Sequence, residues 1–310
     1  MRWPLGRPRM DAFAGLVGVP VAEGDGGVSG MFLGTSSVLL RDGDTALLTD
    51  GFFTRPGWLR VGLGRIAPDR EVIDACLRRA GIGHAGSLAA VICVHSHYDH
   101  AMDAPVIAER LGAKLVGSHS SANIGRGHGL PEEALRTVED GETVRFGDFE
   151  VTFVVGVHCP GDLAPGVIDA PLSPPARARA YRTGEAYSVF FRHPLGTVLV
   201  HGSAGFVPGR LDGHRADIVY LGIGQLGKQD DDYRRRYWAE IVRATGAEVV
   251  IPIHWDDFTT PLLTAPLRPF PYFADDVAVS MRFLVEQSRR DGVRLVLPDL
   301  WRETTLLPVR

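Results

Sequence analysis

The sequence predicts a layered α/β fold, because short apolar strands and amphipathic helices alternate along most of the chain. A second observation is that histidines follow the carboxyl ends of three apolar strands, which places polar groups at one edge of a sheet. A third is that no internal repeat and no flexible linker interrupts the alternation. We therefore expect one domain over residues 26–310, preceded by a flexible leader over residues 1–25.

The amino-acid composition limits the classes of protein to which this chain can belong. The 310 residues are 45% hydrophobic and 23% charged, which is typical of a globular protein with a substantial core. A net charge of −4 gives no reason to expect nucleic acid as a partner, and the apolar runs are too short for a membrane span. Three cysteines, an odd number in a long chain, favour the reducing cytoplasm, although the basic and partly apolar start of the chain leaves secretion open.

The first half of the chain supplies strands and two helices. A turn at residues 41–44 separates two predicted strands, and each predicted helix is followed by a glycine that ends it. The segments around His119 and His128 are predicted to be loops. The predicted strands are 31–40, 45–49, 88–94 and 114–117, and the predicted helices are 70–80 and 103–111.

The second half repeats the alternation after a hairpin at residues 142–155, whose turn is Gly147-Asp148. A proline-rich stretch at residues 160–175 either walls a substrate pocket or is a passive surface loop. The remaining predicted strands are 186–192, 197–200, 217–221 and 249–253, and the predicted helices are 231–245 and 275–290.

The segment His95-Ser96-His97-Tyr98-Asp99-His100 concentrates three imidazoles and a carboxylate directly after a buried strand. The whole chain has 11 histidines in 310 residues, so chance does not explain this cluster. Side chains two apart on a strand point the same way, so His95 and His97 can share one ion. A turn can bring Asp99 and His100 toward a second ion. Zinc accepts both imidazole and carboxylate ligands, and the segment therefore predicts a zinc site.

Two more histidines have the same placement. His158 follows the apolar residues 154–157, and His254 follows the apolar residues 250–253. Ligands at several strand ends converge on one edge of a layered sheet. Cys159 is adjacent to His158, but neighbouring residues of a strand face opposite sides, so we favour His158 as the ligand.

With these residues the chain resembles the metallo-β-lactamase-fold superfamily of hydrolases. His95 to His100 match the pattern His-x-His-x-Asp-His at every defined position, and Asp50 ends an early strand as in the family. The resemblance covers roughly residues 30 to 260. Ile253-His254-Trp255 and Gly202-Ser203-Ala204-Gly205 are most similar to the branch that includes lactonases and N-acyl-phosphatidylethanolamine phospholipases.

The resemblance implies a four-layer αβ/βα sandwich with one or two zinc ions at one edge. It implies that the first ion is bound by His95, His97 and His158, and the second by Asp99, His100 and His254. A metal-bound hydroxide would attack an ester, lactone, amide or phosphodiester of a small-molecule substrate, and Asp99 would also orient that nucleophile. Neither the substrate nor the oligomeric state follows from the sequence.

One position departs from the family pattern. Many relatives carry an aspartate that bridges the two metals where this chain has Ser203, and a neutral hydroxyl is a poor zinc ligand. Ser203 is therefore expected to weaken the second site without excluding it.

Three further residues have two interpretations each. His201 is either a substitute ligand or proton donor, or a histidine bonded to the backbone, and we favour the second. Asp50 either orients a metal-bound imidazole or caps a turn. Tyr98 either reaches the pocket or packs as an ordinary aromatic residue.

Two functions compete with the hydrolase. One is a di-iron oxidoreductase on the same ligands, which would usually need the bridging carboxylate and a flavin partner. The other is a binding or regulatory protein that keeps the fold without chemistry.

Overall fold

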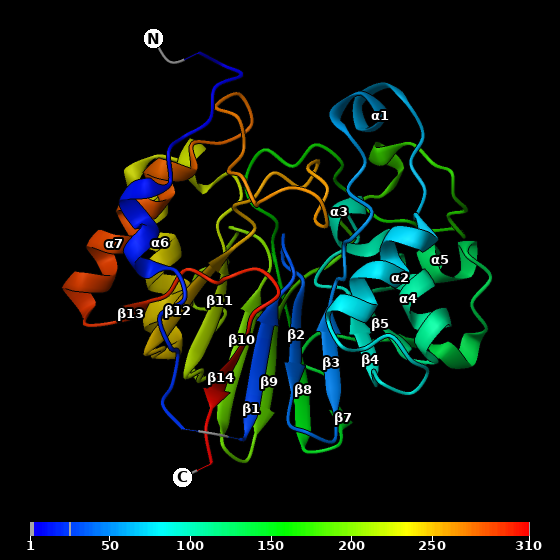
Figure 1. Cartoon of the computed structure of the whole chain (residues 1–310), viewed down its shortest axis with the longest axis horizontal. Coiled ribbons are helices and arrows are strands. Elements are labelled where there is room, and N and C mark those ends of the chain that lie inside the picture. The colour runs from blue at the N-terminus through cyan, green and yellow to red at the C-terminus, as the bar shows by residue number, and fades with distance from the viewer. Residues whose placement is uncertain (1–2, 25, 310) are drawn as a thin grey trace.

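The computed structural model describes residues 3–24 and 26–309 of the chain. Two seven-stranded sheets pack face to face, and helices cover both outer faces, as Figure 1 shows. This is the four-layer sandwich expected from the sequence.

The first sheet has the strand order β14-β1-β2-β3-β4-β5-β6. Its first pairs, up to β2 with β3, are antiparallel, and the pairs from β3 to β6 are parallel. The carboxyl ends of β3, β4 and β5 therefore share one edge. The strands are β1 (Val28–Phe32), β2 (Val38–Arg41), β3 (Ala46–Thr49), β4 (Ala90–Ile92), β5 (Lys114–Gly117), β6 (Leu135–Thr137) and β14 (Glu303–Leu307).

The second sheet has the order β13-β12-β11-β10-β9-β8-β7. The strands β10 to β13 are parallel to one another, whereas β7, β8, β9 and β10 form an antiparallel meander. The strands are β7 (Thr143–Phe146), β8 (Phe149–Gly156), β9 (Ala186–His193), β10 (Gly196–His201), β11 (Ile218–Gly222), β12 (Val249–Ile253) and β13 (Arg294–Leu295).

The helices are divided between the two outer faces. Helices α2, α4 and α5 cover the first sheet, and α6 and α7 cover the second (Figure 1). The α-helices are α1 (Trp58–Leu63), α2 (Arg70–Arg79), α3 (Tyr98–Ala101), α4 (Ala104–Leu111), α5 (His119–Gly127), α6 (Asp231–Trp238) and α7 (Val277–Asp291).

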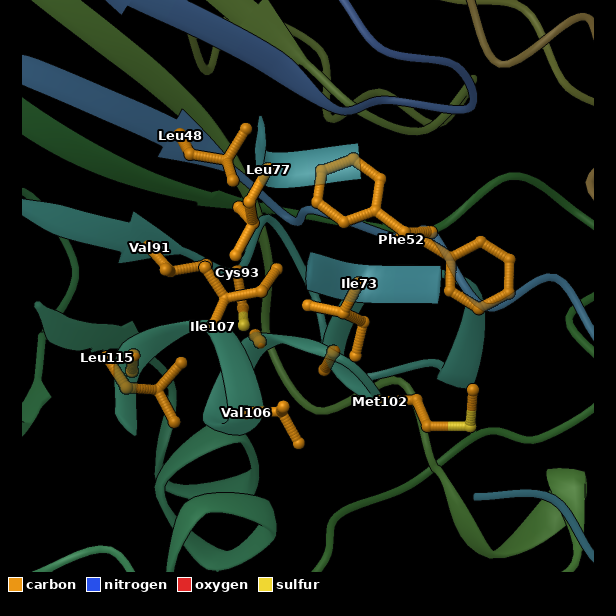
Figure 2. Close-up of a cluster of buried hydrophobic side chains, with 14 of the residues drawn as sticks. Leu48, Phe52, Ile73, Leu77, Val91, Cys93, Met102, Val106, Ile107 and Leu115 are labelled. Carbon is orange, nitrogen blue, oxygen red and sulfur yellow. The ribbon is translucent and has the colours of Figure 1, made fainter. Parts of the chain in front are cut away.

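Three apolar clusters fill the spaces between the four layers, because alternate residues of each strand face opposite sides of the sheet. One lies between the sheets and includes Phe32, Phe153 and Val200. Another lies between α6, α7 and the second sheet. The third joins α2 and α4 to the first sheet, and Figure 2 shows Leu77 of α2 and Ile107 of α4 in it.

The structure corrects two details of the predicted elements. Residues 31–40 form the end of β1, a tight turn and β2, because Gly34 and Thr35 adopt positive φ angles of 91° and 54°. Residues 119–127, predicted as a loop, form α5 although they contain two glycines. The hydroxyl of Ser118 caps this helix by accepting from Ser121 N–H at 3.2 Å, and its buried face packs on the first sheet.

The predicted leader makes specific contacts with the sandwich. Arg7 forms an ion pair with Asp257 at 2.6 Å, Phe13 packs in the cluster beneath α6 and α7, and Leu297 N–H donates to Leu16 O at 2.8 Å. Its flexibility, and the start of the domain at residue 26, stay predictions. Within residues 3–24 and 26–309, no helix has both the length and the apolar character needed to span a bilayer. All three cysteines are free and buried.

Candidate metal centre

The six predicted ligands come from four places at one end of the sandwich. His95 and His97 follow β4, and α3 then carries Asp99 and His100. His158 lies two residues after β8 and His254 one residue after β12. Because these segments leave both sheets at the same end, residues far apart in sequence meet there.

The first three histidines form a compact group. One donor atom from each of His95, His97 and His158 lies within 4.8 Å of the others. The Nε2 atom of His95 is 3.2 Å from Nδ1 of His97. The Nδ1 atom of His158 lies 3.0 Å from Cys159 O and donates to that carbonyl, which leaves the Nε2 lone pair for the group.

Asp99, His100 and His254 form a second group with the same spacing limit of 4.8 Å. The two Nε2 atoms of His100 and His254 are 3.1 Å apart. The Oδ2 atom of Asp99 lies 3.4 Å from His100 Nε2 and 3.3 Å from His254 Nε2. Nitrogen and oxygen lone pairs thus point at one small volume.

Both groups fit a divalent cation. Donor atoms bound tetrahedrally to one zinc at about 2.1 Å lie about 3.4 Å apart, close to the spacings observed here. Burial and the neighbouring histidines lower the pKa of His95 well below its usual range, and burial lowers the pKa of His158 to about 4. Both imidazoles are therefore neutral at pH 7, which is the form that binds a metal.

Around the second group, charge also favours a cation. Burial would lower the pKa of His100, but Asp50 and Asp99 raise it to about 10. Burial would raise the pKa of Asp99, but His100 and His254 hold it well below its usual range. The two carboxylates stabilise positive charge at this position, whether it is a second proton on His100 or a cation that displaces that proton on binding.

Asp50 orients His100. Its Oδ2 accepts from His100 Nδ1–H at 2.8 Å and from the hydroxyl of Ser36 at 2.5 Å, and its Oδ1 accepts from Val94 N–H at 2.9 Å. These bonds fix the carboxylate and leave Nε2 of His100 as the free donor atom. That Asp50 orients a metal-bound imidazole stays a prediction.

Asp162 and Thr183 were not predicted. The Nε2–H group of His97 lies 3.2 Å from Asp162 Oδ1 and 3.1 Å from Thr183 Oγ1, and the threonine hydroxyl donates to Asp162. The His97 ring is thereby held with Nδ1 toward His95. One signal was available for Asp162, which is a carboxylate four residues after a candidate ligand. No sequence signal pointed to Thr183 or to Ser36.

The backbone near His254 is held in an uncommon conformation. His254 has φ 59° and its N–H donates to Thr35 O at 2.6 Å, while Thr35 and Arg55 have φ 54° and 46°. A fully buried ion pair between Arg55 and Asp256, at 2.7 Å, braces this region, and Asp256 also accepts from Thr35 N–H at 2.9 Å. Positive φ at residues other than glycine persists where surrounding contacts impose it.

The remaining predicted residues lie outside the two groups. Ser203 Oγ accepts from Cys159 N–H at 3.0 Å. His201 donates from Nε2 to Gly205 O at 2.9 Å and accepts at Nδ1 from Ser188, at 2.8 Å. Tyr98 packs edge-on against Phe52 and Phe258.

Comparison with known proteins shows which family the chain matches. The model of the family described as "Beta-lactamase superfamily domain" matches residues 73–255. A metal-dependent hydrolase from Chloroflexus aurantiacus is 27% identical over 184 residues, which cover 57% of this chain and 68% of that protein.

Solved structures share the fold at low identity. The metallo-beta-lactamase fold protein YhfI from Bacillus subtilis is 16% identical with a TM-score of 0.54, and the match covers 89% of this chain and 98% of that one. CmlA, a diiron beta-hydroxylase from Streptomyces venezuelae, is also 16% identical with a TM-score of 0.54, and the match covers 91% of this chain and 55% of that one. A metallo-beta-lactamase fold protein and a diiron beta-hydroxylase therefore share this fold with the chain, and the fold alone does not determine the activity.

Proposed function

The chain belongs to the beta-lactamase superfamily, and we propose that it is a zinc-dependent hydrolase that cleaves an ester, lactone, amide or phosphodiester bond in a small molecule. The observation that carries this proposal is the pair of adjacent donor groups, each with three donor atoms within 4.8 Å of one another. Five imidazoles and one carboxylate make up the two groups, and this donor set suits zinc.

The side chains have distinct roles in this proposal. His95, His97 and His158 would hold one ion, and Asp99, His100 and His254 the other. Bound zinc would lower the pKa of a water molecule toward neutrality and offset the negative charge that develops on the cleaved group. Since Oδ2 of Asp99 faces His100 and His254, its other oxygen can accept a hydrogen bond from the attacking water and orient it.

Metal analysis of the purified protein after gentle dialysis is the first test. We expect one to two zinc equivalents per chain, with the second more easily removed because Ser203 contributes no charge. A protein that contains no transition metal and does not take up zinc would refute the proposal. Iron in place of zinc, with oxidase activity, would instead support the di-iron oxidoreductase.

His97→Ala tests the role of one ligand. We expect loss of turnover with an almost unchanged circular dichroism spectrum, because His97 lies at the sheet edge outside the apolar clusters. His119→Ala is the matched control, since its imidazole is 71% exposed and lies outside both groups. A panel of lactones, phosphodiesters, acyl amides and β-lactams identifies the substrate. Zinc uptake without turnover on that panel would favour the non-catalytic alternative.

We also propose a cytoplasmic location. Cys76, Cys93 and Cys159 are all buried thiols without a disulfide partner, which suits a reducing compartment.

A further inference from the structure

An open groove of about 810 Å³ has none of the candidate metal ligands in its lining. The segment 167–182, which Figure 1 shows in green near α1, forms most of its lining, and Arg65 also lines it. Four arginines line this groove with a single carboxylate, that of Asp169. The arginines are Arg65, Arg177, Arg179 and Arg182.

These four arginines have no acidic partner within the part of the chain that the structure describes. Arg65 donates to Pro175 O at 3.3 Å and Arg182 to Pro165 O at 2.9 Å, and both carbonyls are neutral. Elsewhere on the surface, arginines are commonly paired, as Arg126 is with Glu132 at 2.7 Å. The lining therefore carries four positive charges and one negative charge, a net +3, on a chain whose net charge is −4.

The local sequence explains why the arginines point outward. In residues 176–182, Ala176 and Tyr181 are buried while Arg177, Arg179 and Arg182 are exposed. Small or aromatic residues thus anchor the segment, and the guanidinium groups are left facing the groove.

Backbone contacts hold the segments that line the groove. Ile66 and Ala176 exchange two hydrogen bonds, of 2.7 and 3.0 Å, which tie the arginine-bearing segment to the residue after Arg65. The other end is tied to α5, where Asn123 O accepts from Leu172 N–H at 3.0 Å and Asn123 Nδ2 donates to Ile168 O at 2.7 Å. A preformed groove loses little entropy when a ligand binds.

The same segment reaches the metal centre. Thr183, directly after Arg182, contacts His97 Nε2 at 3.1 Å, and Asp162 at the start of the loop contacts the same nitrogen. The segment that lines the groove therefore continues directly into a residue that contacts His97.

We propose that this groove binds an oxyanion group, phosphate or carboxylate, with two or more negative charges. Guanidinium groups bind such oxygens through paired, charge-assisted hydrogen bonds, and four of them around one groove favour multiple charge. The groove has the volume of a small-molecule site. If the proposed hydrolase function is correct, the oxyanion is the acidic part of the substrate.

Titration calorimetry of the full-length, metal-loaded protein with inorganic pyrophosphate tests this site. We expect Arg177→Gln combined with Arg179→Gln to raise the dissociation constant at least about tenfold, because two charge-assisted contacts are removed. Arg289→Gln, on the exposed face of α7, is the matched control and is expected to leave binding unchanged. Thermal melting checks that each variant is folded.

His97→Ala tests whether pyrophosphate binds through the first donor group, because pyrophosphate also binds metals. We expect this variant to bind pyrophosphate as the wild type does. Loss of binding in His97→Ala, equal binding in the double arginine variant and wild type, or no binding by the wild type would each overturn the groove proposal. Binding through the groove by a protein without any hydrolase activity would leave this site standing and refute only the proposed function.

Discussion

Asp50 and His100, 50 residues apart in sequence, are joined by a hydrogen bond of 2.8 Å between Oδ2 and Nδ1, and neither side chain is exposed to solvent. Asp50 directly follows β3 and His100 lies in α3, so the parallel pairing of β3 with β4 brings them together. The bond determines which nitrogen of His100 remains a metal donor.

Asp50→Asn removes the negative charge and keeps the size of the side chain. We expect metal affinity at the group of Asp99, His100 and His254 to fall about 10- to 100-fold, as is typical when the partner of a metal-bound histidine is lost. Competition with a chromophoric chelator measures this affinity. Asp44→Asn, in the exposed turn between β2 and β3, is the control. Equal affinities in Asp50→Asn and wild type would show that the carboxylate does not support the metal.

The sequence predicted the parts of the site that depend on local pattern. The ligands His95 to His100 lie within six residues, and His158 and His254 each follow an apolar run. Their meeting at one edge follows from layered α/β topology alone. The lactonase and phospholipase branch that the sequence suggested stays a prediction.

The parts that were missed depend on the path of loops. Asp162 reaches His97 because of the path that the loop after His158 takes, and no periodicity in the sequence encodes that path. The helix α5 was missed because its glycines and serines have low helix propensity, and burial against the first sheet outweighs that propensity.

The buried pair of Arg55 and Asp256 offers a test of stability. Asp256→Asn would leave the Arg55 guanidinium buried and unpaired, and we expect the free energy of unfolding to fall by about 3–5 kcal/mol. Urea denaturation measures the change. The exposed pair of Arg110 and Asp74 is the comparison, and we expect Asp74→Asn to cost less than about 1 kcal/mol. Similar losses for the two variants would contradict a bracing role for Asp256.

Because of the buried carboxyl of Asp275, we expect the stability of the protein to depend on pH. Burial raises the pKa of its carboxyl from 3.8 to about 7, so the native state keeps this proton at pH values where the unfolded chain has lost it. The proton's contribution to the free energy of unfolding is fully present below pH 3.8. It declines as the pH rises and is lost above pH 7. Wild type should therefore lose stability relative to Asp275→Asn across this range.

The asparagine variant isolates this effect because it stays neutral and can still accept from Gln225 N–H, which lies 2.9 Å from Asp275 Oδ2. Urea unfolding at pH 5 and at pH 8 gives the difference in the free energy of unfolding between wild type and Asp275→Asn, which share the same metal centre. Asp212→Asn, at an exposed position, is the control. A difference that does not change with pH would mean that Asp275 is ionised in the native protein throughout.

A substitution at Ser203 tests whether the carboxylate that the family pattern has at this position can be restored. Its hydroxyl accepts from Cys159 N–H, directly after His158, so the side chain lies close to the first donor group. If position 203 faces both metals, Ser203→Asp should tighten binding of the second zinc by at least about tenfold, because it adds a negative charge. The same charge should raise the pKa of the metal-bound water and move the pH–rate profile upward.

Ser203→Asn controls for size and hydrogen bonding without the charge, and zinc titration of the three proteins separates the possibilities. Tighter binding in the aspartate variant alone would assign the effect to the carboxylate. Equal second-site affinities in all three would mean that residue 203 only supports the Cys159 backbone, and that five imidazoles and Asp99 are the complete set of side-chain ligands for both ions.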